Sequence, residues 1–280
     1  MRRRLGALLL AAACWSVGST AQTGQDLSTE LVRQTLVLRN YYTGQKLKYD
    51  AGGKLLSGGA PGPSPTDGRV YIQQVRLDKN TLVIRGEHPI SVFDPATGDT
   101  TLLGLHERVD IEAQLPSNQP ASESAHPALD KIFLTTAEAN AIACTEKEEK
   151  TFREVMLRLT QFISAKPPQT PTGGEPLQLC FPAGSRAYIA GNGVTRPEEA
   201  KVYPPAYPLG QPPSHTKLAH LAIIVDESGK PTSLVVVGSA ATVFDLAAIQ
   251  AVRGWKFHPG SYQDHPVPTA ITVEVAFQSD

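Results

Sequence analysis

The C-terminal stretch, residues 203–280, constrains the fold most, because its apolar pattern changes period along the chain. Apolar runs at Leu221–Val225 and Leu234–Val237 predict two strands, and Asp226–Gly229 between them predicts a tight turn. Phe244–Arg253 has apolar residues at helical spacing, and Ile271–Phe277 alternates again. The order strand, turn, strand, helix, strand predicts a small α+β module. It contains no recognisable catalytic arrangement, so the pattern favours a docking function.

The last predicted strand has the clearest alternation in the chain. Its large apolar residues at every second position are expected to face the core: Ile271, Val273, Val275 and Phe277. The residues between and after them are expected to face outward: Thr272, Glu274, Ala276 and Gln278. In the helix before it, we expect Thr242 to be the N-cap and Asp245 to favour the positive end of the helix dipole.

This stretch resembles the C-terminal domain of TonB energy transducers over about residues 203–279. The resemblance rests on an ordered set of motifs: Tyr207-Pro208, the hairpin Val225–Lys230, the helix Phe244–Arg253, Trp255–Pro259, the turn Asp264–Pro268 and the strand Ile271–Phe277. The upstream β-rich region and Gly191–Thr195 also resemble proteins of this family from soil-dwelling acidobacteria.

The resemblance implies a ββαβ domain in the periplasm that binds a short segment of an outer-membrane transporter. In that family the segment pairs with the edge of the sheet, so that backbone hydrogen bonds give affinity and side-chain pockets give register. The candidate edge here is Thr269–Gln278. The candidate partner-binding residues on it are Thr272, Glu274, Ala276 and Gln278.

The N-terminus predicts export. Residues 2–4 are arginines, an apolar run follows from Leu5 to Val17, and small residues follow at 19–21. This pattern is typical of a secretory signal peptide, here residues 1–21 with cleavage between Ala21 and Gln22. The apolar run is shorter than the roughly 20 residues of a membrane-spanning helix. An uncleaved anchor that faces the periplasm and a lipoprotein at Cys14 remain alternatives.

Two cysteines remain after such a cleavage, Cys144 and Cys180. In an oxidising compartment an isolated pair is readily a disulfide, and two buried thiols are the alternative. Positive and negative charges nearly cancel, with 26 Lys and Arg against 27 Asp and Glu. No basic stripe indicates nucleic-acid binding.

The rest of the chain divides by composition into a β-rich domain, residues 26–116, and a helical segment, residues 128–166. In the first, short alternating strands separated by turn residues predict an antiparallel sheet. A linker is expected at Pro116–Pro127. In the second, Thr135 or Thr136 can cap a helix, with Glu138 placed for a capping box, and an apolar stripe that includes Phe152 and Met156 predicts a core-facing helix. Residues 176–280 are expected to form the TonB-like domain, with its core at 203–279.

The expected function is therefore a periplasmic protein-binding module linked to outer-membrane transport through edge-strand pairing. A membrane-anchored energy transducer is one alternative, although the chain lacks the long proline-rich span of alternating charge that transducers have. A secreted enzyme in the β-rich region is another. It is disfavoured because the chain has no Gly-x-Ser-x-Gly and no His-Glu-x-x-His motif. We expect no cofactor, no metal and no nucleic-acid partner.

Overall fold

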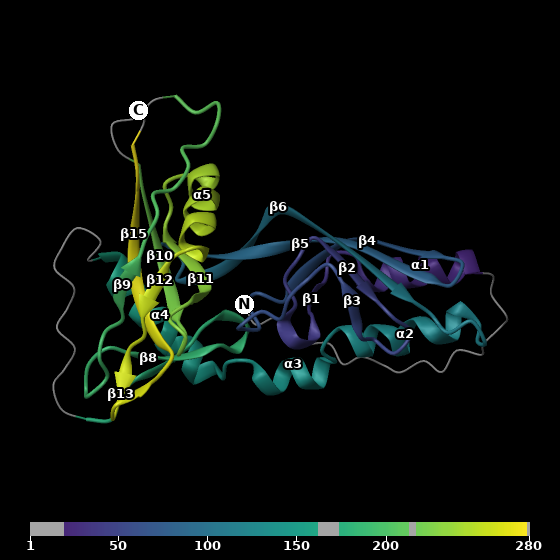
Figure 1. Ribbon diagram of the computed structural model, residues 1–280, viewed down its shortest axis with the longest axis horizontal. Helices are drawn as coiled ribbons and strands as arrows, with labels where there is room; N and C mark the ends of the chain where they lie inside the picture. Colours follow the sequence, from purple (N-terminus) through teal and green to yellow (C-terminus); the bar gives the residue numbers. More distant parts are fainter. Residues whose placement is uncertain (1–19, 162–173, 213–216, 279–280) are drawn as a thin grey trace, which may run out of the picture.

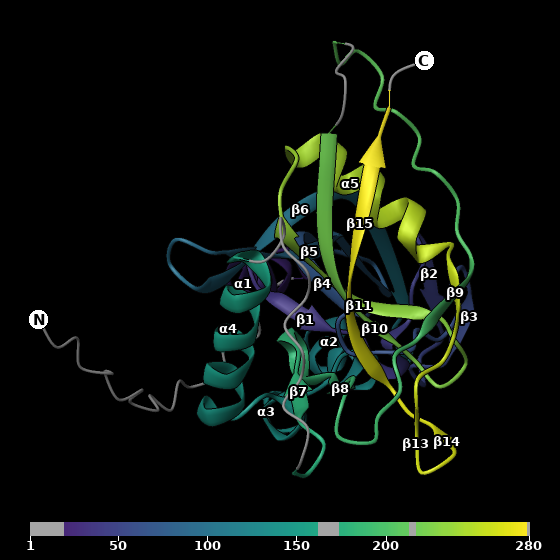
Figure 2. The same cartoon turned by 90° about the vertical axis from the view of Figure 1, so that its left-hand side faces the viewer.

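The protein has an α+β fold built around one long mixed sheet (Figures 1 and 2). The computed structural model describes residues 20–161, 174–212 and 217–278. The first part of the chain forms α1 (Thr20–Leu31), β1 (Thr35–Val37), η1 (Arg39–Tyr41), β2 (Lys46–Tyr49), β3 (Leu55–Ser57), β4 (Arg69–Asp78), β5 (Thr81–Asp94) and β6 (Asp99–Gln114). The middle forms α2 (Ala121–Ile132), α3 (Thr136–Ile142) and α4 (Glu146–Gln161).

The described part of the remainder forms a second group of strands together with helix α5 and the short turn η2. It forms β7 (Gln178–Cys180), η2 (Pro182–Gly184), β8 (Arg186–Ile189), β9 (Glu198–Lys201), β10 (Lys217–Val225), β11 (Pro231–Gly238), α5 (Thr242–Arg253), β12 (Lys256–His258), β13 (Ser261–Tyr262), β14 (His265–Pro266) and β15 (Thr269–Phe277). The eleven-stranded sheet has the order β3-β2-β6-β5-β11-β10-β15-β8-β7, and β4 and β1 extend it beside β5.

The β-rich region confirms the predicted strands and, with one exception, their antiparallel pairing. Most neighbours are antiparallel, whereas β2 runs parallel to β6 from Lys46↔Asp110 to Tyr49↔Ala113. The predicted antiparallel sheet is therefore confirmed for most of its pairs, and the parallel pair of β2 and β6 departs from it. Strand alternation cannot reveal the direction of a neighbour, because side chains alternate between faces in both kinds of pair.

The core of this region lies between the sheet and two helices. Leu82, Ile84 and Ile111 of the sheet are buried with Leu27 of α1 and Ile132 of α2. The sequence did not predict α1. The predicted linker Pro116–Pro127 is also wrong in part, because α2 begins at Ala121 and contains Pro127.

The helix α2 forms in spite of its internal proline because its apolar residues have helical spacing. Ala121, Ala125, Ala128, Leu129 and Ile132 are all buried against the sheet. This burial outweighs the lost backbone hydrogen bond of Pro127. The predicted capping box of α3 is confirmed, since Thr135 Oγ1 accepts from the Glu138 N–H and the Glu138 carboxylate accepts from the Thr135 N–H.

The C-terminal module has the predicted order of strand, strand, helix and strand. Helix α5 packs on one face of β10, β11 and β15 through Phe244, Ala248 and Val252. Helix α4 covers the other face, where Phe152 and Met156 contact a cluster that includes residues of β10 and β11. With both faces covered, the strands β10 and β11 are continuously buried along most of their length.

The start of α5 differs from the expectation. Thr242 is the first residue of the helix, the N-cap is Ala241, and no side chain caps it. Asp245 organises the preceding loop instead, because its carboxylate accepts from the Ser239 hydroxyl at 2.5 Å and from the Ala240 N–H at 2.9 Å. Asp245 is only 2% exposed, and these hydrogen bonds provide the partners that its buried carboxylate needs.

The two strand groups join through a short parallel pairing between β11 and β5. Val235 lies opposite Ser91, and Val236 lies opposite Val92. In Figure 1, β5 and β6 extend between the part of the molecule that carries α1 and α2 and the part that carries α5. The sheet is therefore continuous from the N-terminal strands into the C-terminal module.

Candidate protein-binding edge

The strand β15 has the alternation that the sequence predicts. Ile271, Val273, Val275 and Phe277 are buried, while Glu274, Ala276 and Gln278 are exposed and Thr272 is half-buried. On one side β15 pairs with β10 in an unshifted register from Thr269↔Val225 to Phe277↔Lys217. This strand places the four predicted partner-binding residues along one edge of the module.

The other side of β15 is paired only at its beginning. The strand β8 runs parallel to it, with Tyr188 opposite Thr269 and Ile189 opposite Ala270. The first two residues of the predicted edge are therefore occupied. Among the described strands, none pairs with β15 on this side beyond Ala270.

The direction of the free backbone groups follows from one hydrogen bond. The Tyr188 N–H of β8 donates to the Pro268 carbonyl at 2.9 Å, so the even-numbered residues direct their backbone groups toward this side. Because strand residues alternate and the register with β10 has no shift, Thr272, Glu274 and Ala276 present their N–H and C=O groups at the free edge. The odd-numbered residues hydrogen-bond to β10.

The side chain of Glu274 has a partner that the sequence reasoning missed. Its carboxylate lies 3.1 Å from Nε2 of His220, the residue directly opposite on β10. The two positions carry complementary groups on one face of neighbouring strands, and the alternation of both strands could have indicated this pair. Glu274 therefore contributes its backbone, more than a free carboxylate, to the edge.

Comparison with known families identifies this module. Residues 219–278 match the family model described as Gram-negative bacterial TonB protein C-terminal. The protein contains a TonB C-terminal domain. No curated protein matches the chain. The match covers β10 to β15 and ends at the free edge, whereas the N-terminal sheet, the helices α1–α4 and the strands β7–β9 lie outside it.

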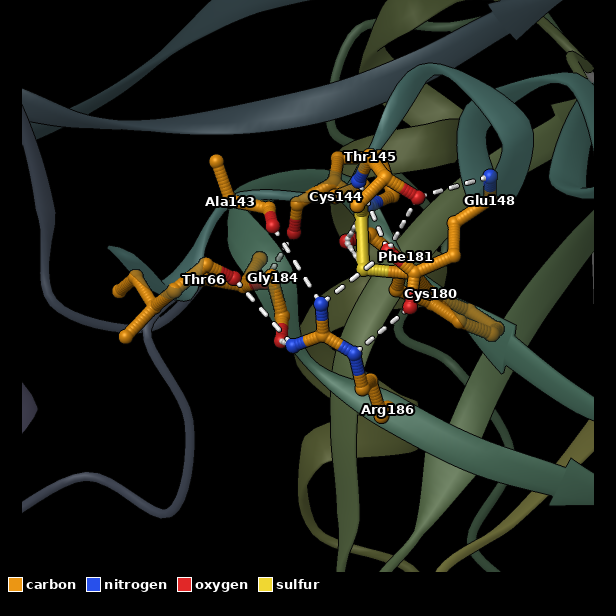
Figure 3. The surroundings of a disulfide bond; sticks show 11 residues. Thr66, Ala143, Cys144, Thr145, Glu148, Cys180, Phe181, Gly184 and Arg186 are labelled. Carbon is orange, nitrogen blue, oxygen red and sulfur yellow. Dashed lines mark hydrogen bonds and ion pairs between the residues drawn. A yellow bond between two sulfur atoms is a disulfide. The ribbon is translucent and has the colours of Figure 1, made fainter. Parts of the chain in front are cut away.

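The strand β8, which limits the edge of the TonB C-terminal domain, is held by a disulfide and a salt bridge (Figure 3). Cys144, just before α4, is bonded to Cys180 of β7 with a Cα–Cα distance of 5.7 Å. Arg186 of β8 donates to both oxygens of Glu148 in α4, at 2.9 and 3.2 Å. These two links connect the β7–β8 hairpin to the start of α4.

The Glu148 carboxylate is the centre of the second link. It accepts from Arg186 and from the Thr145 N–H at 2.7 Å, and the Thr145 hydroxyl is also within hydrogen-bonding distance. The bond from Arg186, followed by those from Thr145, lowers the pKa of Glu148 to about 2. The carboxylate thus stays ionised at any physiological pH and caps α4 while it binds β8.

The strand β9 lies beside the free edge of the TonB C-terminal domain (Figure 2). It pairs with β12, with Glu199 opposite Phe257. A hollow of about 360 Å³ lies between β9 and β15, lined by residues 196–199, Phe257 and residues 271–273. The sequence did not predict it, because it depends on a contact between segments far apart in the chain.

Other predictions concern membranes, metals and the N-terminus. No helix in the described part of the chain is long and apolar enough to cross a membrane. The described residues also include no group of three or more His, Cys, Asp or Glu side chains arranged to hold a metal ion. Residues 1–19 of the predicted signal peptide, with Cys14, lie outside the described residues, and the predicted cleavage site Ala21–Gln22 falls in the first turn of α1.

Proposed function

We propose that this protein is a periplasmic protein-binding module whose TonB C-terminal domain takes up an extended segment of a partner at the free edge of β15. The observation that carries the proposal is the run of outward-facing backbone groups at Thr272, Glu274 and Ala276, beyond the end of β8. The matched family supports a role in the cell envelope, and the partner that fits it is a segment of an outer-membrane transporter.

The edge has the properties of a strand-addition site. An open edge favours association with any extended chain, and proteins usually block such edges with short strands, bulges or inward charges. The strand β15 is nine residues long, has an unshifted register and carries one acidic side chain. Its buried face is fixed by α5, so a partner strand meets a preorganised template.

Location in the periplasm rests on the family and on the predicted signal peptide. Mass spectrometry of the protein purified from cells measures its N-terminus. Gln22 as the first residue is expected for a cleaved, periplasmic protein. A protein that retains residues 1–21 and is recovered in the membrane fraction would instead support the anchored transducer.

Photocrosslinking tests the edge directly. The full chain carries a photoreactive phenylalanine analogue in place of exposed Gln278 and is irradiated with outer membranes of a Gram-negative bacterium. We expect crosslinks to an integral outer-membrane protein, mapped by mass spectrometry to one extended segment. Ala276→Pro removes one outward N–H and should abolish the crosslink, whereas Ala276→Thr keeps that N–H and should retain it.

Ala276 is the better site for this test than Glu274, because Glu274 also binds His220. Circular dichroism and thermal unfolding establish that both variants remain folded. A crosslink that persists in folded Ala276→Pro would show that the partner does not pair with this edge.

A further inference from the structure

We propose that the hollow between β9 and β15 is a specificity pocket that takes one large apolar side chain from the strand added to β15. This inference rests on the proposed function, because the pocket acts only on a segment that pairs with the edge. The occupant is an extended segment of a partner protein with one aromatic or large aliphatic residue, flanked by polar residues.

The chemistry of the lining supports an apolar occupant. Phe257, Ile271 and Val273 are buried members of the core under α5, and they form the apolar part of the lining. Residues 196–199 form the opposite wall, in which Arg196, Glu198 and Glu199 are exposed and Pro197 is buried. Ligand pockets commonly have this combination of apolar lining and a few polar groups. A volume of about 360 Å³ is at the small end of their range and suits one large side chain.

The position of the hollow fixes which partner residue enters it. Pairing with β8 ends at Ala270, so Thr272 is the first residue with free backbone groups. The hollow adjoins this residue, since residues 271–273 form one of its walls. The partner residue opposite Val273 therefore lies at the pocket mouth, because its side chain is on the same face of the sheet as that of Val273.

Strand geometry explains why neighbouring partner residues stay outside. Side chains of an added strand alternate between the face covered by α5 and the opposite face. Phe257, Ile271 and Val273 belong to the α5 side, so only residues that point to that side reach the hollow. The adjacent residues point to the other face, where the His220–Glu274 pair lies.

Glu199 offers a way to fill the pocket without altering the core. It lies opposite Phe257 in the antiparallel pair of β9 and β12, so the two side chains lie on the same face. Glu199 is exposed, and its carboxylate makes no ion pair with any described residue. Glu199→Trp is therefore expected to place an indole across the hollow. Glu227→Trp, in the exposed turn between β10 and β11, is the matched control.

A library of random heptapeptides displayed on phage is the probe, selected on the full-length wild-type chain. We expect selected peptides to share one large apolar position and to lose binding to Ala276→Pro. For a synthetic peptide from this set, Glu199→Trp should weaken binding roughly tenfold, as should alanine at the shared position. The two changes together should cost no more than either alone, and Glu227→Trp should have no effect.

The outcomes separate the pocket from the edge. Selected peptides that lose binding to Ala276→Pro and yet share no apolar position would overturn the pocket and leave edge pairing intact. The same conclusion would follow if they lose binding to Ala276→Pro but bind Glu199→Trp as well as the wild type. Peptides indifferent to Ala276→Pro would overturn both. If the edge is instead occupied by a second copy of the chain, sedimentation will show a dimer that Ala276→Pro dissociates, and the pocket proposal is then wrong.

Discussion

Ser233 Oγ donates a hydrogen bond to Ser64 Oγ at 3.0 Å, across 169 residues of sequence. Both serines are buried, Ser233 in β11 of the TonB C-terminal domain and Ser64 in the loop before β4. Ser64 in turn donates to the Asp67 carboxylate at 2.5 Å. Together with the pairing of β5 and β11, this polar chain links the N-terminal region to the C-terminal domain. We therefore expect the two parts to unfold together.

The first prediction concerns Ser64. Ser64→Ala removes the acceptor of Ser233 and the donor to Asp67, which leaves two polar groups without their partner. We expect a loss of about 1–3 kcal/mol in the free energy of unfolding. A buried polar group left without a hydrogen-bond partner bears its full desolvation cost with nothing to offset it. Urea denaturation measures it, with exposed Ser57→Ala as the control. An equal effect of both variants would contradict a structural role for the Ser64 bonds.

The second prediction concerns the pH dependence of stability through Asp67. Burial raises the pKa of Asp67, although the Ser64 hydrogen bond and the charges of Arg253, Arg69 and His88 oppose this rise. A carboxyl with a raised pKa binds its proton more tightly in the folded state. Its contribution to stability is therefore fully present below the unfolded pKa of 3.8 and is lost as pH rises through the folded pKa.

Asp67→Asn cannot ionise and should lack this dependence. The free energy of unfolding of the variant minus that of the wild type is expected to increase as pH rises above 3.8. Glu138 and Glu148 have lowered pKa values and act in the opposite sense, but they are present in both proteins and cancel in the difference. Exposed Asp264→Asn is the control, and a flat difference for Asp67→Asn would contradict the prediction.

The sequence predicts those parts of the TonB C-terminal domain that depend on local pattern. The alternation of Ile271–Phe277 predicts both the strand and its buried face, because the side chains repeat every second residue. The Thr135–Glu138 box is recognised for the same reason, since a cap needs two residues at one spacing.

Features that depend on contacts between distant segments could not be predicted in this way. The occupation of Thr269 and Ala270 by β8 depends on where the β7–β8 hairpin docks, and no pattern in β15 indicates it. Thr242 is a different case, because it lies one residue inside α5 and the nearby Asp245 holds the loop before the helix.

The third prediction concerns the link between Cys144 and Cys180. In the chain-entropy account, closing a loop with a sequence separation of 36 residues stabilises the fold by about 3–4 kcal/mol. We expect Cys144→Ser with Cys180→Ser to lower the free energy of unfolding by an amount of this order. Denaturation of the wild type with reductant provides a second measurement and should approach the value for the double variant.

The position of this disulfide also predicts a local effect. It ties the β7–β8 hairpin to α4, so its loss should increase amide hydrogen exchange in β8 more than in β10. Equal exchange in the two strands, or a thiol titration that finds two free cysteines in the native protein, would contradict the assigned role.

The fourth prediction compares two adjacent proline substitutions in β15. The N–H of Val275 faces β10 and its side chain is buried, whereas the N–H of Ala276 faces the free edge and its side chain is exposed. Val275→Pro should therefore leave a backbone carbonyl of β10 unpaired, at a cost of about 1–3 kcal/mol, in addition to lost core packing, and should unfold the domain. Ala276→Pro should keep the near-UV circular dichroism of the wild type and melt within a few degrees of it. The reverse order of stability would mean that the odd-numbered residues face the free edge, and the binding edge would then have to be reassigned.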